Sequence, residues 1–238
     1  MKKIIFDTYA EMCKAAADYV AEQLANKPDS VLGLATGSTP LGLYDELVRR
    51  SRDGVIDFSQ VRTFNLDEYY PIRKDDPQSY NYYMQANLFS KVDFLSTRVL
   101  DGEVDDPLEE CAKFDTELNA AGGIDLQILG MGPNGHIAFN EPSESYLAAT
   151  HLEELTDSTI DANSRFLTEG ETLPTAALTM GIGSIFSAKK ILLLINGKNK
   201  AGIAKLLFED KIHTLVPASL LKLHHDVTVL MDREAADT

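Results

Sequence analysis

Long hydrophobic runs are missing from this sequence of 238 residues. The longest continuous apolar run covers only residues 191–195, whereas a bilayer span needs ~20 apolar residues. The N-terminus carries two lysines, but the apolar run behind them is three residues long before Asp7 interrupts it, which is too short for a secretion signal. We therefore expect a cytoplasmic protein with no membrane partner.

Cysteine is also scarce. The two cysteines, Cys13 and Cys111, lie in segments with helical periodicity. One pair in a chain without a secretion signal is typical of reduced thiols rather than a disulfide. Hydrophobic residues make up 44% of the chain, so it can form a full core without a disulfide or a structural metal.

Positive charge is the third shortage. Lysine and arginine number 22 against 37 acidic residues, which gives a net charge of −15. This charge repels nucleic acid and anionic lipid, so we expect neither as a partner. It also repels anionic substrates at long range. A phosphorylated substrate would therefore need a local cluster of backbone amides, arginine and lysine.

Two periodicities alternate along the chain. Short segments typical of strands, apolar or rich in apolar residues, lie at residues 31–35, 61–66, 124–129, 190–195 and 227–231. Helical patterns lie at residues 10–24, 41–51, 79–89, 107–121 and 198–208. Apolar strands that alternate with helices predict an α/β fold with a parallel sheet covered on both faces. Ligands of such folds bind outside the carboxyl ends of the strands.

The domain organisation follows from what separates these elements. The sequence has no internal repeat, low-complexity tract or linker, so we expect a single domain over residues 1–238. The least regular segment, residues 142–174, is polar, acidic and rich in threonine and serine. We expect it to leave the sheet and to contain a mobile lid within about residues 143–174.

A motif of small residues follows the strand at residues 31–35. Thr36, Gly37, Ser38 and Thr39 lead directly into the next helix. Small side chains let an anion approach the backbone, the hydroxyl groups donate hydrogen bonds, and the helix N-terminus adds partial positive charge. The spacing is not that of a P-loop. Taken alone, the motif leaves phosphate binding and a plain capped turn both open.

Two adjacent carboxylates follow the strand at residues 61–66. Asp67 and Glu68 stand directly before Tyr69 and Tyr70. An aromatic wall desolvates a carboxylate and raises its pKa, which suits a general base. The alternative interpretation is a helix cap or a solvated turn.

The most informative stretch is residues 130–142, GMGPNGHIAFNEP. It contains the GxGxxG fingerprint of dinucleotide sites, but Pro142 follows too soon for the helix that such a site needs. His136 and Glu141 in the same loop indicate proton transfer instead, because an imidazole titrates near neutral pH and a carboxylate can orient it. We expect structural roles for the other histidines, His151, His213, His224 and His225.

Two cations complete the set of candidates. Arg165 lies in the segment NSRF, and Lys200 follows the strand at residues 190–195. In so acidic a chain, a lysine at the carboxyl end of a central strand indicates a phosphate ligand. Without the other motifs, a solvated helix cap would be the preferred interpretation.

Seven segments together resemble the glucosamine-6-phosphate deaminase family, in the family's order over nearly the whole chain. They are LATGSTPLGLY, FNLDEYY, QSYNYYM, ILGMGPNGHIAFNEP, ANSRF, ALTMGIGSI and GKNK. The resemblance implies a Rossmann-like three-layer sandwich with a mainly parallel sheet, related to ribose-5-phosphate isomerase and CoA-transferase-like folds. It also implies conversion of glucosamine 6-phosphate to fructose 6-phosphate and ammonia, with neither cofactor nor metal.

The resemblance also implies residue roles. The phosphate ligands would be Thr36, Gly37, Ser38, Thr39, Arg165 and Lys200. His136, oriented by Glu141, would open the sugar ring, and Asp67 would move a proton from C2 to C1. Water would then displace ammonia. A lid carrying Arg165 would exclude bulk water during this step.

The sequence departs from parts of the family in two places. Asn134, which we include in the catalytic group, stands where many members have Asp, so His136 would depend more on Glu141 alone. Larger, hexameric members bind an activating N-acetylated sugar phosphate through basic residues after the NEP motif. Residues 151–154 read HLEE here and would repel a phosphate. We therefore predict no such activation, and a monomer.

Three alternatives stay open from the sequence. A 6-phosphogluconolactonase would share the fold and the phosphate site but would not need Asp67 as a base. A deaminase of galactosamine 6-phosphate would differ at one substrate hydroxyl, which the sequence does not distinguish. A sugar-phosphate sensor would bind without catalysis, but such sensors typically accompany a helix-turn-helix, and none is visible here.

Overall fold

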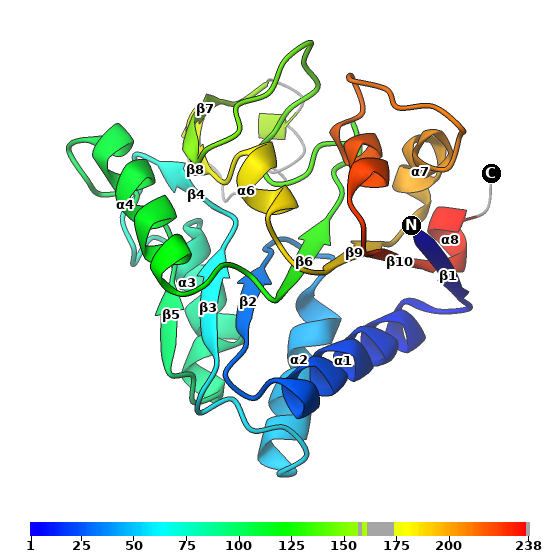
Figure 1. Cartoon of the computed structure of the whole chain (residues 1–238), viewed down its shortest axis with the longest axis horizontal. Coiled ribbons are helices and arrows are strands. Elements are labelled where there is room, and N and C mark those ends of the chain that lie inside the picture. The colour runs from blue at the N-terminus through cyan, green and yellow to red at the C-terminus, as the bar shows by residue number, and fades with distance from the viewer. Residues whose placement is uncertain (157–158, 161–173, 237–238) are drawn as a thin grey trace.

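A computed structural model describes residues 1–156, 159–160 and 174–236. Its centre is a seven-stranded sheet in the order β1-β10-β9-β6-β2-β3-β5, and every pairing in it is parallel (Figure 1). The strands are β1 (Lys2–Phe6), β2 (Val31–Leu34), β3 (Arg62–Asn65), β5 (Ser96–Arg98), β6 (Leu126–Gly130), β9 (Ile191–Ile195) and β10 (Val227–Asp232).

Helices cover both faces of this sheet (Figure 1). On one face lie α1 (Tyr9–Asn26), α2 (Leu41–Arg52) and α3 (Tyr80–Asn87). On the other lie α4 (Pro107–Ala120), α6 (Ile182–Phe186), α7 (Ala201–Leu207) and α8 (Arg233–Ala236). Three short 3-10 helices complete the described helices: η1 (Phe89–Lys91), η2 (Lys198–Lys200) and η3 (Pro217–Leu223). The predicted α/β sandwich is confirmed.

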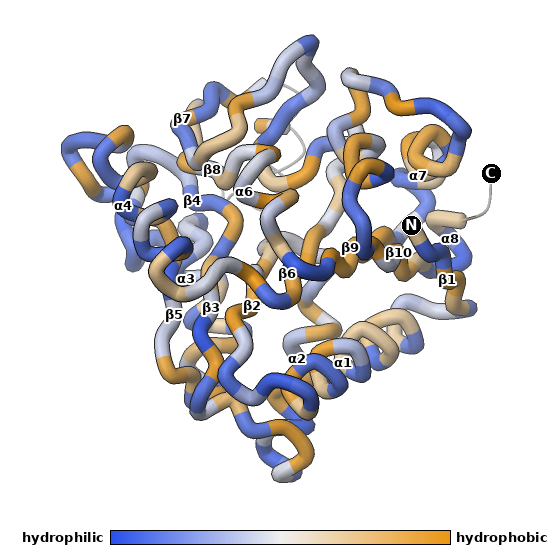
Figure 2. The backbone as a smooth tube through the Cα atoms, viewed as in Figure 1, coloured by the Kyte–Doolittle hydropathy of each residue, from blue (hydrophilic) through white to orange (hydrophobic). Residues whose placement is uncertain are grey.

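The strands are apolar because both of their faces are buried. In β9, Leu192 and Leu194 pack with α1 and α2, while Ile191, Leu193 and Ile195 pack in the cluster on the opposite face. Figure 2 shows that β9 and β10 are hydrophobic along their length. Continuous apolar runs of this kind are what a parallel sheet between two helical layers requires.

Cys13 and Cys111 are both buried and unpaired, as the sequence predicted. They belong to different hydrophobic clusters on opposite faces of the central sheet. The sheet therefore separates the two thiols. Among the described residues, no helix is long and apolar enough to cross a bilayer.

A second sheet was not predicted. It is antiparallel, in the order β4-β8-β7, and consists of β4 (Asp67–Tyr70), β8 (Ala176–Thr179) and β7 (His151–Glu154). Residues 67–70, which we placed after the end of a predicted strand, therefore form a strand of their own. Its alternation places the Asp67 carboxylate toward one side and the neighbouring Glu68 toward the other.

Several other boundaries differ from the prediction. Strands β1 and β5 were missed, because each is short and largely exposed at an edge of the sheet. The helix expected at residues 198–208 divides into η2 and α7. The predicted lid lies partly outside the described residues, and within it residues 151–154 form β7. A single domain with a mobile lid stays a prediction.

Candidate active site

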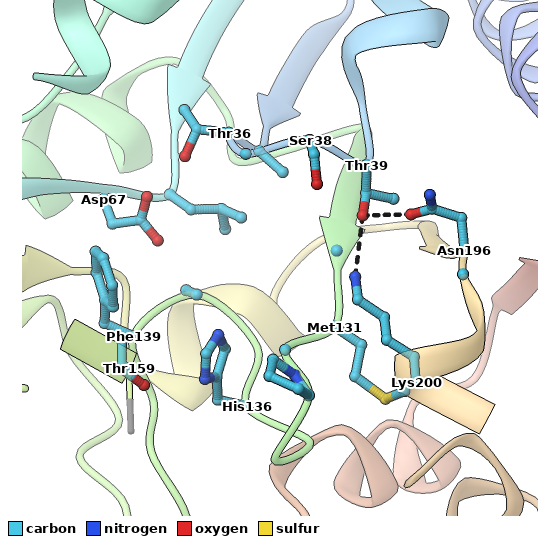
Figure 3. Close-up of a pocket in the computed structure, with 18 of the residues that line it drawn as sticks. Thr36, Ser38, Thr39, Asp67, Met131, His136, Phe139, Thr159, Asn196 and Lys200 are labelled. Atoms are coloured by element: carbon cyan, nitrogen blue, oxygen red, sulfur yellow. Dashed lines mark hydrogen bonds between the residues drawn. The ribbon is translucent and has the colours of Figure 1, made fainter. Parts of the chain in front are cut away.

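The carboxyl ends of β2, β6 and β9 open into one cavity of about 460 Å³ (Figure 3). Strand β4 contributes to the same cavity from the second sheet. The polar side chains that matter for its chemistry are Thr39, Asp67, His136, Thr159, Asn196 and Lys200. This is the edge of the sheet at which ligands of parallel α/β folds bind.

The loop after β2 forms one wall of the cavity. Thr36, Gly37, Ser38 and Thr39 all line it, and Gly37 has a φ of +89°, which favours glycine. Among the described residues, none accepts a hydrogen bond from the backbone N–H groups of Gly37, Ser38 or Thr39. These groups are therefore available to an anion, and phosphate binding by this loop stays a prediction.

Two tyrosines hold this loop from outside the cavity. The Tyr83 hydroxyl donates to the carbonyl of Gly37 at 2.7 Å, and the Tyr9 hydroxyl donates to the carbonyl of Thr39 at 2.9 Å. Tyr9 also accepts the N–H of Gly42 at 2.8 Å. Helices α1 and α3 thus fix the carbonyl groups of the loop away from the position of an anion.

Lys200 reaches the same end of the cavity from η2 (Figure 3). Its Nζ donates to Thr39 Oγ1 at 3.0 Å, and that hydroxyl donates to Asn196 Oδ1 at 2.7 Å. The backbone N–H of Gly197, which has a φ of +87°, lies 3.1 Å from both carboxylate oxygens of Asp232. Asn196, Gly197 and Asp232 were not predicted, although Asn-Gly after a strand is a turn signal.

Arg165, the other predicted phosphate ligand, lies outside the described residues.

Asp67 lies at the start of β4, with its side chain directed into the cavity (Figure 3). Only 6% of the residue is exposed, and burial, followed by the nearby Glu68 charge, raises the pKa of its carboxyl to about 8. The stacked rings of Tyr80 and Phe139 also line the cavity. A desolvated carboxylate of this kind is a strong base.

His136 lies in the loop after β6, and this loop turns so that Gly132 lies against the imidazole ring of His136. Gly132 lies so close that an added Cβ would come within 2.3 Å of the imidazole Nε2. No helix forms between β6 and β7, which agrees with our rejection of a dinucleotide site. Only glycine at this position leaves room for the imidazole in its place at the cavity wall.

The carboxylate of Glu141 stands behind His136. Glu141 Oε1 lies 3.6 Å from His136 Nδ1, which is longer than a hydrogen bond, and catalytic contacts often tighten only with substrate bound. Asn134 Nδ2 donates to Glu141 Oε2 at 2.8 Å, and Asn134 Oδ1 accepts a hydrogen bond from the backbone N–H of His136 at 3.2 Å. Asn134 therefore contributes no charge but holds both members of the pair.

Thr159 was missed by the sequence analysis. Its hydroxyl donates to Glu141 Oε1, the carboxylate oxygen nearer to His136. Burial raises the pKa of Glu141, but the nearby His136 and the hydrogen bonds from Thr159 and Asn134 outweigh burial, and the pKa falls below its usual value. An ionised Glu141 is therefore available to orient the imidazole and to stabilise its charged form.

The sequence matches the family described as glucosamine-6-phosphate isomerases/6-phosphogluconolactonase over residues 7–230. A glucosamine-6-phosphate deaminase of Thermoanaerobacter sp. (strain X514) is 52% identical, with 99% of this chain and 94% of the relative covered. One of Halothermothrix orenii is 50% identical, with 99% of each chain covered.

Solved structures give the same picture. A monomeric glucosamine-6-phosphate deaminase superposes with a TM-score of 0.95 at 44% identity, over 99% of each chain. A 6-phosphogluconolactonase from Leishmania guyanensis has a TM-score of 0.78 at 20% identity, over 99% of this chain and 97% of that one, which shows a shared fold. The resemblance seen in the sequence is confirmed: the chain belongs to the family of glucosamine-6-phosphate isomerases and 6-phosphogluconolactonases.

Proposed function

We propose that this chain is a glucosamine-6-phosphate deaminase, which converts glucosamine 6-phosphate to fructose 6-phosphate and ammonia. The observation that carries the proposal is that Asp67 and His136 face one cavity whose other end holds Lys200 and Thr39, with the rest of the loop of residues 36–39 along the wall between them (Figure 3). A lactonase would require activated water but no second proton-transfer group at Asp67. The deaminase relatives of about 50% identity support the same choice.

The sugar binds with its 6-phosphate at the N–H groups of Gly37, Ser38 and Thr39 and at the Lys200 ammonium. We include Thr36 and Arg165 among the phosphate ligands. This cluster of donors overcomes the repulsion by the net charge of −15. The reacting carbons then point toward the carboxylate and the imidazole at the opposite end of the cavity.

Ring opening is the task of His136. The imidazole accepts the proton of the anomeric hydroxyl and returns a proton to the ring oxygen as the C1–O5 bond breaks. Glu141 stabilises the imidazolium formed between these two transfers, and Asn134 and Thr159 hold Glu141 in position.

Isomerisation is the task of Asp67. The carboxylate removes the proton from C2 of the open-chain aldehyde and returns it to C1, and one proton of the amino group is transferred to O1, which leaves an imine at C2 and a hydroxyl group at C1. Water adds to that imine, and ammonia leaves as the C2 carbonyl of fructose 6-phosphate forms. One carboxylate can serve both carbons because they are adjacent and share one face of the substrate.

The purified protein should release ammonia and fructose 6-phosphate in equal amounts from glucosamine 6-phosphate. A preference for galactosamine 6-phosphate would change the substrate but not the reaction. Hydrolysis of 6-phosphogluconolactone that survives Asp67→Asn would identify a lactonase. Binding of the sugar phosphate without turnover would identify a sensor.

We further propose that the enzyme acts as a monomer in the cytoplasm, without activation by an N-acetylated sugar phosphate. The monomeric deaminase of 44% identity supports this state. So does β7, whose Glu153 and Glu154 would repel an anionic effector. Light scattering should give the mass of one chain. A sigmoidal rate curve that N-acetylglucosamine 6-phosphate makes hyperbolic would contradict the proposal.

A further inference from the structure

We propose that Glu68 is a positioning residue for the deaminase reaction: its carboxylate anchors helix α3 to β4 and places a negative charge next to Asp67 in the chain, on the opposite side of the strand. The inference rests on the proposed function, because it assigns a role relative to the base of that reaction. Only 1% of Glu68 is exposed, and the residue does not line the cavity. It therefore acts through other groups and not on the substrate.

Glu68 accepts three hydrogen bonds from backbone N–H groups of the described residues. Its Oε1 accepts from Tyr80 at 2.7 Å and from Tyr69 at 3.0 Å, and its Oε2 accepts from Asn81 at 2.8 Å. Tyr80 and Asn81 are the first two residues of α3. The carboxylate thus satisfies two free N–H groups at the helix N-terminus, where negative charge is favourable.

Helix α3 connects Glu68 to the cavity through Tyr80 and Tyr83. Tyr80 at its first position lines the cavity wall and stacks on Phe139, with 5.9 Å between the ring centroids. Tyr83, one turn later, donates to the carbonyl of Gly37 in the anion-binding loop at 2.7 Å. Glu68 therefore connects the strand that bears the base with both the cavity wall and the phosphate end of the site.

An uncharged residue would not make the same contacts. A glutamine amide has one acceptor oxygen, and its NH₂ group would face an N–H donor. The helix also has its own cap, because Ser79 Oγ accepts the Tyr82 N–H at 2.9 Å. A buried carboxylate is costly to desolvate, so a second, charged acceptor at this position indicates a use for the charge.

That charge acts on Asp67. Burial raises the pKa of both carboxyls, but three backbone N–H groups partly offset this for Glu68, whose pKa is about 7, whereas among the described residues no hydrogen bond does so for Asp67, whose pKa is about 8. Glu68 therefore loses its proton first, and Asp67 titrates beside a carboxylate that raises its pKa. In the described part of the chain, the other titratable groups near Asp67 are the hydroxyls of Tyr44 on α2 and Tyr80 on α3, and the imidazole of His136 across the cavity. Asp101 adds a negative charge near Glu68.

The test compares the pH dependence of kcat/KM in four forms of the full chain. Glu68→Gln removes the charge and keeps the size, and Glu68→Asp keeps the charge but shortens the reach. Ser79→Ala is the matched control, because it weakens the same helix end without touching any charge. Since kcat/KM reports ionisations of free enzyme and free substrate, the ionisations of the sugar phosphate affect all four forms equally.

We expect Glu68→Gln to move the acid limb of the pH profile of kcat/KM to lower pH by about one unit, because the pKa of Asp67 falls when the neighbouring like charge is removed. Glu68→Asp and Ser79→Ala should leave the limb in place. Ser79→Ala should lower the melting temperature by about 2–4 °C. The folded fraction of each variant is measured at every pH and the rate is divided by it, so a poorly folding variant still gives a limb position.

An unchanged limb in Glu68→Gln, with a lower melting temperature as in Ser79→Ala, would reduce Glu68 to a helix cap and overturn the proposal. A wild-type protein that releases no ammonia from glucosamine 6-phosphate would instead overturn the proposed function. The two failures are therefore distinguishable in the same series of experiments.

Discussion

Asp67 carries a carboxyl whose protonation differs between the folded and unfolded chain. Its pKa is about 8 in the folded protein against 3.8 in the unfolded reference, because burial opposes the charge. Between these two pH values the folded state holds a proton that the unfolded state has lost. Stability contributed by this group is therefore present below about pH 4 and is lost as the pH rises toward 8.

Asp67→Asn should abolish catalysis and stabilise the fold at alkaline pH. The amide keeps the shape of the side chain but has no charge to bury. We expect a gain on the order of 2 kcal/mol at pH ~8.5, which corresponds to a melting temperature higher by about 4–8 °C. The difference should shrink as the pH falls to ~4. A wild-type protein as stable as the variant at pH ~8.5 would show that this carboxylate is not desolvated.

Thr159 acts on the imidazole through Glu141. Thr159→Val keeps the shape of the side chain and removes the hydroxyl donor, so we expect kcat to fall about 10-fold, as the loss of one hydrogen bond to a charged group predicts. Thr159→Ser is the matched control and should retain most of the activity. Equal rates for the valine and serine variants would show that the hydroxyl has no part in orienting Glu141.

At the scale of elements, helix α3 connects the wall of the cavity to the anion-binding loop. Tyr83→Phe removes the hydrogen bond to the Gly37 carbonyl and leaves the ring in place. We expect KM for the sugar phosphate to rise about 2- to 10-fold with little change in kcat, because one neutral hydrogen bond contributes ~0.5–1.5 kcal/mol. Tyr82→Phe on the exposed side of the same helix should change neither constant.

The elements that the sequence predicted well are those with a strong hydrophobic period. Strands β2, β6 and β9 lie in the interior of the sheet, and burial on both faces made their sequences predominantly apolar. The second sheet escaped prediction because β4 and β7 consist largely of polar or aromatic residues, DEYY and HLEE. Their pairing with β8 depends on contacts between residues far apart in the chain.

The site residues that the sequence predicted are likewise those that stand next to a strand with a clear hydrophobic pattern. Asp67 and His136 were predictable because each stands just after a predicted strand, and a parallel sheet brings such positions to one edge. Asn196 and Thr159 were not, because a single threonine or asparagine in a polar segment has no distinguishing pattern. Their roles come from contacts with Thr39 and Glu141, which lie 157 and 18 residues away in the sequence.

At the scale of the whole molecule, the fold brings a local cluster of donors to one edge of an acidic protein. The loop after β2 offers backbone N–H groups, and Lys200 adds a positive charge from beyond β9. The base and the imidazole come from two further strand ends, β4 and the loop after β6. The proposed reaction therefore needs four segments that only the assembled sheet brings together.

The most direct test of this account is an assay of the purified protein with glucosamine 6-phosphate that follows ammonia and fructose 6-phosphate together. The wild type should release both in equal amounts. Asp67→Asn should release neither, and His136→Gln should be slowed at ring opening by about 100-fold or more. A folded wild-type protein that binds the sugar phosphate and releases no ammonia would contradict the account.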